Sequence, residues 1–440
     1  MATRASVAPA GKVTEVFVDA AEREGAFRLL ENRAAEPAEV IFAAARAGFT
    51  RVIDEPFVFI PLDQTALSLP AVPKDSEMGA VGNRWSADLG LHVMHGIIVT
   101  AEGVTAGSGG QTYWVRPPQE WRSRAKTFGA GKKLRRTIKA TNRPIAEKET
   151  VHWGTAIELA RDAAKAAGYK GKLWFQLDAG ADFAHLLASM TILDSYVTVR
   201  TRNERKLLEK EGLLADEVIE SPPLGTYELD VPETNNRPGR RATLEVRYVP
   251  MVLRLRPRGE GGTIPAPLFA VHTREISKVP RGGKPLDWLL LTNMPGATRD
   301  DALTVINGYA TRWRIEEVHK TWKSVTQIEE SALESLHAFS LWAAVLFSVA
   351  IRIERLKLFA RTQPTAPATI ELGHDELRLL CRIRKSAVAP SEIEIAVAVR
   401  WIADLGGYMN PHQGPPGSIT IARGLRHLRL SSVAIQEAEK

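Results

Sequence analysis

Cysteine is nearly absent from this chain of 440 residues, and the single one, Cys381, lies in the apolar stretch Leu379-Leu380-Cys381. One cysteine excludes an internal disulfide and a cysteine-rich zinc site, so we expect a buried, inert thiol. Long hydrophobic runs are also lacking. The longest, AFSLWAAVLFSVAI at residues 338–351, is too short to span a bilayer and ends at Arg352. We interpret it as a buried helix and expect no membrane association.

Two further features are missing. No internal repeat is visible, and the first residues, MATRASVAPAGKV, lack the hydrophobic segment of a signal peptide. We therefore expect a cytoplasmic protein.

The composition that is present is that of an ordinary soluble protein. With 44% hydrophobic residues, the chain can bury one large core and a second, smaller one. Lys and Arg number 58 against 51 Asp and Glu, which gives a net charge of +7. This balance suits a polyanionic partner, although many basic proteins bind none.

Two aspartates each follow a short apolar run. The run FVFIPL at residues 57–62 is typical of a buried strand and precedes Asp63, after which residues 64–67 are expected to leave the strand. The run KLWFQL at residues 172–177 is a second such strand and precedes Asp178. An Asp at a strand end is more often a turn or helix cap than a ligand, so both interpretations stay open.

The rest of the chain mixes helical and strand patterns. Residues 92–100 and 112–115 predict two strands that would form an antiparallel meander with the first strand. Period-two alternation from about 202 to 284 predicts a β-rich insertion. Disorder is expected at residues 1–12, followed by short helices within 13–47. Further helices are expected at 150–167, 182–190, 300–308 and near 338–358, and strands at 195–200 and 288–292. The chain should end in a helical part at 369–440 that is interrupted at 406–407 and 412–417.

Positive charge is concentrated in two places. Residues 121–143, WRSRAKTFGAGKKLRRTIKATNR, hold nine Arg and Lys side chains. Arg254, Arg256 and Arg258 share one parity, so a strand would present them on one face. Both groups suit phosphate contact, and both also suit plain solvent exposure.

The most informative stretch is YATRWRIEEVHKTWK at residues 309–323, which has no proline or glycine and predicts one helix. At about 100° per residue, four polar side chains fall within a stripe about 60° wide: Tyr309, Arg312, Glu316 and Lys323. The opposite face is apolar and can be buried: Ile315, Val318 and Trp322. A carboxylate that binds a metal beside cations that bind a phosphate needs such a stripe, but a solvated helix face with spaced ion pairs has it too.

The spacing Tyr, two residues, Arg, three residues, Glu, six residues, Lys resembles the signature of the YREK group of bacterial DDE transposases. The run as a whole is most similar to transposon-five-like members of the insertion-sequence-four family. The similarity extends over about residues 15–430. Its most specific parts are FVFIPLDQTALSL around Asp63, WFQLDAGAD around Asp178, KPLDWLLLT before the signature helix, and WIADLGGYMN near the end.

The resemblance implies an α/β fold: a ribonuclease-H-like mixed sheet with helices, an inserted β-rich subdomain, and helical N- and C-terminal parts. It implies a shortened N-terminal DNA-binding region at residues 1–50 and a catalytic domain at 51–201 and 286–360. The insertion would be 202–285, and 369–440 would form a helical dimerisation region.

The resemblance also implies cut-and-paste DNA transposition by phosphoryl transfer, through strand nicking, hairpin formation and strand transfer. Asp63, Asp178 and Glu316 match the catalytic acids. They would bind two Mg²⁺ ions about 4 Å apart, for which Mn²⁺ would substitute. The partners would be double-stranded DNA, as transposon ends and target, and a second copy of the chain. The protein would be associated with the bacterial nucleoid when bound to DNA.

Five other positions match residues that contact DNA in these transposases. Tyr309, Arg312 and Lys323 match those that grip the backbone near the scissile phosphate. Trp288 matches an aromatic residue that stacks on a flipped base, although a plain core position is the alternative. Arg200 matches a basic DNA-contacting position more loosely.

Some features depart from the family pattern and keep other functions open. The box after the second acid is Asp-Arg-Glu-Ala-Asp in the family, but here it is Asp178-Ala179-Gly180-Ala181-Asp182. The N-terminal helices are shortened and the C-terminus stops early. The alternatives are a catalytically silent, transposase-derived DNA-binding protein, a nuclease that cuts without joining, and a helical scaffold with no nucleic-acid role.

Overall fold

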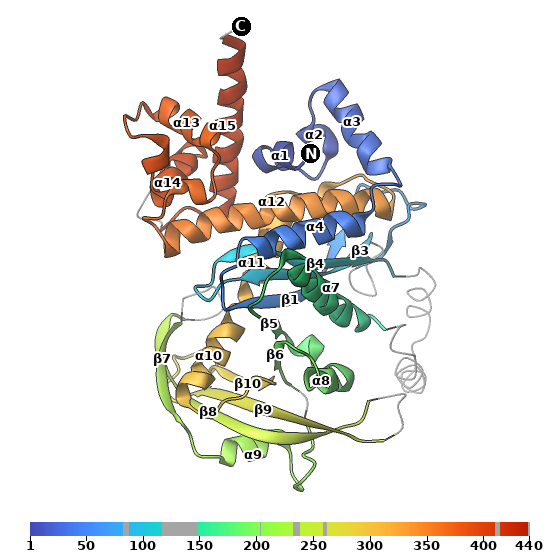
Figure 1. The fold of residues 1–440 in the computed structure, drawn as a ribbon, viewed down its shortest axis with the longest axis vertical. Helices are drawn as coiled ribbons and strands as arrows, with labels where there is room; N and C mark the ends of the chain where they lie inside the picture. Colours follow the sequence, from blue (N-terminus) through green and yellow to red (C-terminus); the bar gives the residue numbers. More distant parts are fainter. Residues whose placement is uncertain are drawn as a thin grey trace.

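A computed structural model describes the chain except for residues 82–87, 117–147, 203, 232–237, 258–261, 410–413 and 439–440. Its centre is a ten-stranded mixed sheet in the order β2-β3-β1-β5-β6-β10-β9-β8-β7, with β4 paired to β3 (Figure 1). The strands are β1 (Phe57–Ser68), β2 (Gly79–Ala80), β3 (Leu89–Val99), β4 (Thr105–Trp114), β5 (Lys172–Leu177), β6 (Tyr196–Arg200), β7 (Gly225–Val231), β8 (Arg240–Leu255), β9 (Ile264–Glu275) and β10 (Asp287–Thr292). The fold class is therefore α/β.

The first strand has different neighbours on its two sides. β1 pairs antiparallel with β3, which pairs antiparallel with β4, so the predicted meander is confirmed. On its other side β1 pairs in parallel with β5, from Phe57 opposite Lys172 to Leu62 opposite Leu177. The prediction that residues 64–67 leave the strand was wrong. They stay paired with β3 up to Ser68 opposite Gly90, while β5 ends at Leu177.

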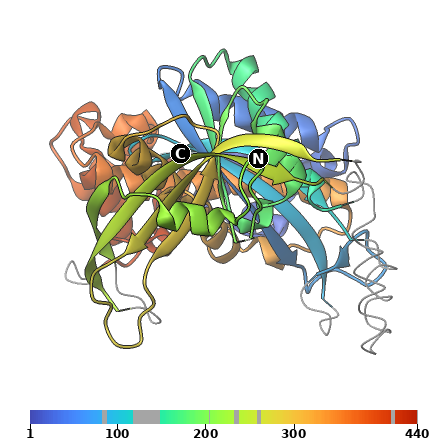
Figure 2. The same cartoon turned by 90° about the horizontal axis from the view of Figure 1, so that it is seen from below.

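The strands of the 202–285 region continue the same sheet. β10 pairs antiparallel with both β6 and β9, and β8 links β9 to β7. Viewed from below, the strands cross the molecule as one twisted sheet (Figure 2). The sequence pattern missed one helix in this region, α9 (Leu214–Glu220), which buries Leu214 and Val218.

Helices cover the sheet and form both ends of the chain (Figure 1). The N-terminal helices are α1 (Ala2–Val7), α2 (Val13–Val16), α3 (Ala20–Glu31) and α4 (Pro37–Thr50); the central ones are α7 (Val151–Ala167), α8 (Ala184–Met190), α10 (Arg299–Ala310), α11 (Trp313–Ser324) and α12 (Leu336–Thr362); the C-terminal ones are α13 (His374–Arg384), α14 (Ile395–Leu405) and α15 (Ser418–Ala438). The expected disorder at residues 1–12 was wrong for α1, which buries Ala5 completely.

The apolar run forms the interior of α12, as predicted. In the described part of the chain, α12 alone has the length and composition to cross a membrane, but 72% of its most apolar window is buried inside the structure. It packs against α1, α3 and α4, against β4 and α11, and against α14 and α15. The helix is therefore the common core element of the N-terminal, central and C-terminal parts. Cys381, on α13, is buried as expected.

The signature stretch is not one helix, as the sequence pattern had predicted. α10 ends at Ala310 and α11 begins at Trp313, so Thr311 and Arg312 form a turn between them. The Thr311 hydroxyl donates to the Gly308 carbonyl at 2.6 Å, which competes with the regular helix ladder. The two helices also pack against different elements: α10 contacts β5, β8 and β9, while α11 contacts β1, β3 and α12.

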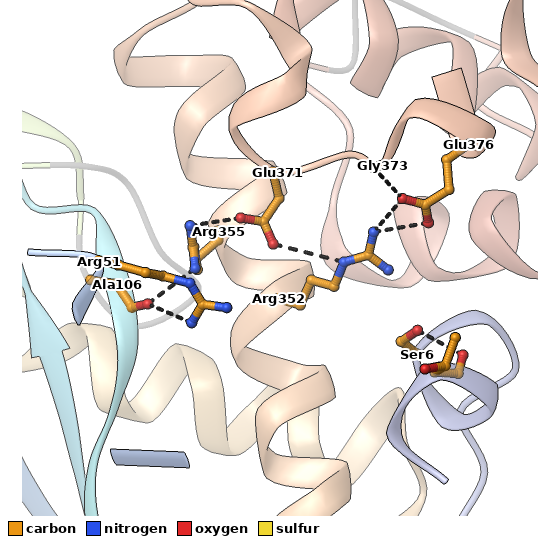
Figure 3. A network of polar contacts seen from close by, with 9 residues as sticks. Ser6, Arg51, Ala106, Arg352, Arg355, Glu371, Gly373 and Glu376 are labelled. Carbon is orange, nitrogen blue, oxygen red and sulfur yellow. Dashed lines mark hydrogen bonds and ion pairs between the residues drawn. The ribbon is translucent and has the colours of Figure 1, made fainter. Parts of the chain in front are cut away.

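Two buried polar clusters attach the C-terminal part to the rest. In the first, Arg355 of α12 pairs with Glu371 at 2.7 Å and donates to the Ala106 carbonyl of β4, and Arg352 pairs with Glu376 at the start of α13 (Figure 3).

In the second cluster, Glu354 of α12 accepts hydrogen bonds from Thr321 of α11 and from Ser418 at the start of α15, and it pairs with Lys357. Glu354 is 1% exposed, so α11, α12 and α15 meet at one desolvated carboxylate.

Candidate active site

The structure brings the two predicted aspartates together. Asp63 and Asp178 directly follow Leu62 and Leu177, which are paired across the parallel strands β1 and β5. Neighbouring strands lie about 5 Å apart, and in-register residues of parallel strands point to the same face. Both aspartates line one pocket of about 410 Å³, together with His92, Glu149 and Trp153.

Each aspartate uses one oxygen locally. Asp178 Oδ1 accepts from the Gly180 amide at 2.8 Å and so caps the short 3-10 turn Ala179–Ala181. Asp63 Oδ1 accepts from the Gln64 amide at 3.0 Å. Asp178 is thus a capping residue, which was one of the two interpretations of the sequence. The second oxygen of each carboxylate, Oδ2, would be the one to contact a metal.

The last acid of the altered box has a structural contact. Asp182 is 6% exposed, forms an ion pair with Arg205 and accepts a hydrogen bond from the Thr201 hydroxyl at 2.7 Å. It therefore fixes the turn after β5 to the chain that follows β6.

Asp63 has an unusual electrostatic environment. Burial raises its pKa from 3.8 to about 7, the Arg312 guanidinium opposes this shift, and the nearby Asp178 and Glu316 carboxylates add to it. Both other acids therefore lie close enough to repel a charge on Asp63. A carboxyl group that ionises near neutral pH, beside two further carboxylates, is typical of a functional site.

The third acid, Glu316, reaches the aspartates through Arg312. Arg312 Nη2 contacts Glu316 Oε1 at 2.6 Å, and its Nη1 lies 3.8 Å from Asp63 Oδ2. The Arg312 side chain is only 14% exposed. Glu316 itself lines a second pocket of about 620 Å³, which the two aspartates do not line, together with Trp313, Lys320 and Lys357.

The side chains as they stand do not form a closed metal site. Within the described residues, no three His, Cys, Asp or Glu side chains are grouped so that they could hold an ion. The donor set of three carboxylates is nevertheless the one that Mg²⁺ prefers. A cation shared by all three would compete with the Arg312 guanidinium for the negative charge of Glu316 and Asp63.

Tyr309 and Trp288 lie at the edge of this acid cluster. Tyr309 is buried, and burial raises the pKa of its hydroxyl while Arg312 and Arg200 oppose the shift. The Trp288 ring meets the Tyr309 ring edge-on, with centroids 5.5 Å apart. Trp288 is half-buried, so in this structure it packs on the protein and keeps part of its surface open.

Arg200 and Lys323 have contacts of their own. Arg200 Nη2 donates to the Asp287 carbonyl at 3.5 Å, at the long limit for a hydrogen bond. Lys323 Nζ donates to the Ala66 carbonyl at 2.7 Å, three residues beyond Asp63 on β1. Lys323 thus ties α11 to the part of β1 that sequence reasoning had taken for a loop.

Sequence reasoning missed a pair of buried histidines on β3 and α11, the elements next to Asp63 and Glu316. His95 faces Asp63 across the β1–β3 ladder, and its Nδ1 lies 3.1 Å from His319 Nε2 on α11. Burial lowers the pKa of His319 from 6.5 to about 3, so the pair is neutral near pH 7. His319 follows Val318 on the apolar side of α11, and a histidine in that stripe was an available signal.

Trp313 was also missed. Its side chain is 61% exposed, and the Arg312 guanidinium lies 5.9 Å from its ring. The sequence shows an aromatic residue beside the charged residues of the signature. Its exposure could not be predicted, because the direction of the side chain depends on the turn at Thr311.

Of the two basic groups predicted from the sequence, one lies wholly and the other partly outside the described residues. Residues 121–143 and Arg258 lie outside them, and Arg254 and Arg256 are exposed.

Comparisons with known proteins add little. No protein-family model matches the chain. Among solved structures the chain is similar to one described as the cryo-EM structure of piggyBac transposase synaptic complex with hairpin DNA, at 8% sequence identity and a TM-score of 0.34. The match covers 88% of this chain and 54% of that chain, so this chain spans about half the length of its neighbour. A likeness at this level carries no argument about fold or function.

Proposed function

We propose that this protein is a metal-dependent DNA transposase of the YREK-signature DDE group. One observation carries the proposal: Asp63 and Asp178 directly follow the last paired residues of the parallel strands β1 and β5, and Glu316 is joined to Asp63 through the Arg312 guanidinium. Acids from two neighbouring strands and one helix, within a single electrostatic cluster, suit two-metal phosphoryl transfer.

The proposed catalytic core is ribonuclease-H-like. The strand order β4-β3-β1-β5-β6, an antiparallel meander followed by two parallel strands, supports this assignment. Residues 202–285 are the proposed insertion, and residues 1–50 the proposed DNA-binding region.

In the proposed mechanism Asp63, Asp178 and Glu316 would hold two Mg²⁺ ions, whose charge would activate the attacking oxygen and stabilise the leaving one. A water oxygen attacks the phosphorus, the bond to the 3′-oxygen breaks, and that oxygen leaves as a 3′-hydroxyl. The 3′-hydroxyl would then attack the opposite strand, form a hairpin and release that strand's 3′-oxygen as a hydroxyl. A second water would reopen the hairpin, and the regenerated 3′-hydroxyl would attack the target DNA. Burial raises the pKa of Asp63 to about 7 in the absence of metal, so binding of Mg²⁺ would release a proton from this carboxyl group and should weaken as pH falls below that value.

Cations and aromatics around the acids would bind the DNA. Arg312 supplies a planar guanidinium that matches a phosphate, while Lys320 and Lys323 supply point charges. The exposed Trp313 and the half-buried Trp288 offer faces on which an unpaired base stacks. Tyr309 would position the backbone beside Asp178.

We further propose that two copies act together on the DNA through the helices of residues 369–440. α15 extends away from the rest of the molecule (Figure 1) and exposes Ile419 and Leu430. The protein would work in the cytoplasm, at the nucleoid.

The deciding experiment is a nicking assay on DNA that contains the inverted repeats flanking the gene. We expect Mg²⁺-dependent nicks, hairpins and joined products, all lost in Asp63→Asn and Glu316→Gln. Nicks without hairpins or joined products would identify a nuclease that cuts but does not join.

A second candidate is a silent DNA-binding protein of transposase descent. The observation in its favour is that Glu316 is engaged by Arg312 and Asp178 by the Gly180 amide. Retarded migration of the same DNA, with no cleavage in Mg²⁺ or Mn²⁺, would select this candidate.

A further inference from the structure

Arg312 occupies the place that a divalent cation would need. Its guanidinium is mostly buried, holds Glu316 Oε1 at 2.6 Å and faces Asp63 Oδ2 at 3.8 Å. A guanidinium group has only hydrogen-bond donors and no lone pair of electrons to offer, so it cannot be a ligand of the metal ion itself. A metal ion bound by Glu316 and Asp63 therefore competes with Arg312 for Asp63 Oδ2 and for the negative charge of Glu316.

We propose that Arg312 is a displaceable internal counter-ion: it neutralises the acid cluster while no metal is bound, and it must leave Glu316 when a divalent cation enters. This rests on the proposed function and adds to it a coupling between metal and DNA. A DNA phosphate is a bidentate partner for the released guanidinium, so DNA binding would draw Arg312 away and free Glu316.

Charge balance explains why a counter-ion is needed. Asp63, Asp178 and Glu316 interact at close range in a half-buried site, and Arg312 provides a cation placed between two of them. Without it, the acids would repel one another strongly at low dielectric. With it, the helix carrying Glu316 stays beside the strand carrying Asp63 in the absence of metal.

The position of Arg312 in the chain permits the exchange. It belongs to the turn between α10 and α11, and not to the interior of either helix. Its guanidinium is already 5.9 Å from the Trp313 ring, which is exposed and offers a second resting place for a cation. Glu316 and Trp313 both line the pocket of about 620 Å³, so the path outward is open.

Binding of Mn²⁺, followed by the electron paramagnetic resonance signal of the free ion at pH 8 without DNA, tests the proposal. The variants are Arg312→Gln, Glu316→Gln, Asp63→Asn and a matched control, Arg314→Gln. Arg314 lies on α11, the helix that carries Glu316, and pairs with Glu317 at 2.7 Å, so its removal deletes the same charge from another ion pair.

We expect Arg312→Gln to bind Mn²⁺ at least about tenfold more tightly than wild type, since a cation within a few ångströms changes the affinity of such acids by an order of magnitude or more. Arg314→Gln should stay within about twofold, because the Arg314–Glu317 pair is partly exposed and screened by solvent, and the structure shows no contact between Arg314 and the three acids. A short DNA duplex should increase the Mn²⁺ affinity of the wild-type protein, once the ions bound by DNA alone are subtracted. The same duplex should leave the Mn²⁺ affinity of Arg312→Gln unchanged.

Mn²⁺ affinity that is unchanged or weaker in a folded Arg312→Gln variant would overturn the proposal. If that variant does not fold, the duplex experiment on wild type decides, because no tightening by DNA would also overturn it. Failure of the proposed function looks different: Mn²⁺ would then bind equally well to wild type, Asp63→Asn and Glu316→Gln.

Discussion

Replacement of Asp63 by Asn should change the pH dependence of stability. Between about pH 4 and pH 7 the folded protein keeps a proton on Asp63 that the unfolded chain has released. The stability that this proton contributes is fully present below about pH 4 and is lost as pH rises through about 7. A rise in pKa from 3.8 to about 7, at about 1.4 kcal/mol per pH unit, sets an upper limit of about 4 kcal/mol.

An asparagine side chain at this position cannot ionise, so Asp63→Asn should gain stability relative to wild type by up to this amount from pH 5 to pH 8. Urea unfolding followed by circular dichroism, with a chelator present, measures the difference. Asp162→Asn, which removes an exposed carboxylate on α7, is the control and should show no trend. A wild-type to Asp63→Asn difference that is constant over this range would refute the electrostatic reasoning.

Three further predictions follow from the same region. Gly308→Ala should lose about 1–3 kcal/mol in urea unfolding, because the new Cβ would stand 2.5 Å from Phe59 Cε1. His319→Gln should resist acid better than wild type. The folded pKa of His319 is about 3, so wild type loses stability as pH falls from about 6.5 towards 3, and pH-dependent unfolding midpoints measure this. Trp313→Ala should change stability by less than about 0.5 kcal/mol but weaken DNA binding by about 1–3 kcal/mol in fluorescence anisotropy, because an exposed ring is removed from the DNA face. Trp313→Phe should recover most of that binding.

The sequence was sufficient for features that depend on apolar pattern alone. The runs before Asp63 and Asp178 are strands because β1 and β5 are buried in the sheet, where continuous apolar runs are stable. Ile315, Val318 and Trp322 are fully buried, so the predicted inner face of the signature helix is confirmed.

Features that depend on neighbours could not be predicted. β1 continues past Asp63 because β3 remains paired with it, which no local pattern reveals. The helix break at Thr311 depends on a hydroxyl that bonds to the Gly308 carbonyl. The position of Arg312 between two acids depends on how that break turns α11 towards β1.

The buried Glu354 has a mechanical consequence. It joins Ser418, the first residue of α15, to Thr321 in the last turns of α11, the helix that also carries Glu316. A displacement of α15 must either break these hydrogen bonds to a buried carboxylate or move α11 with it. A force on α15, as in the proposed pairing of two copies, would therefore reach the helix of Glu316 through this carboxylate and not through the sheet.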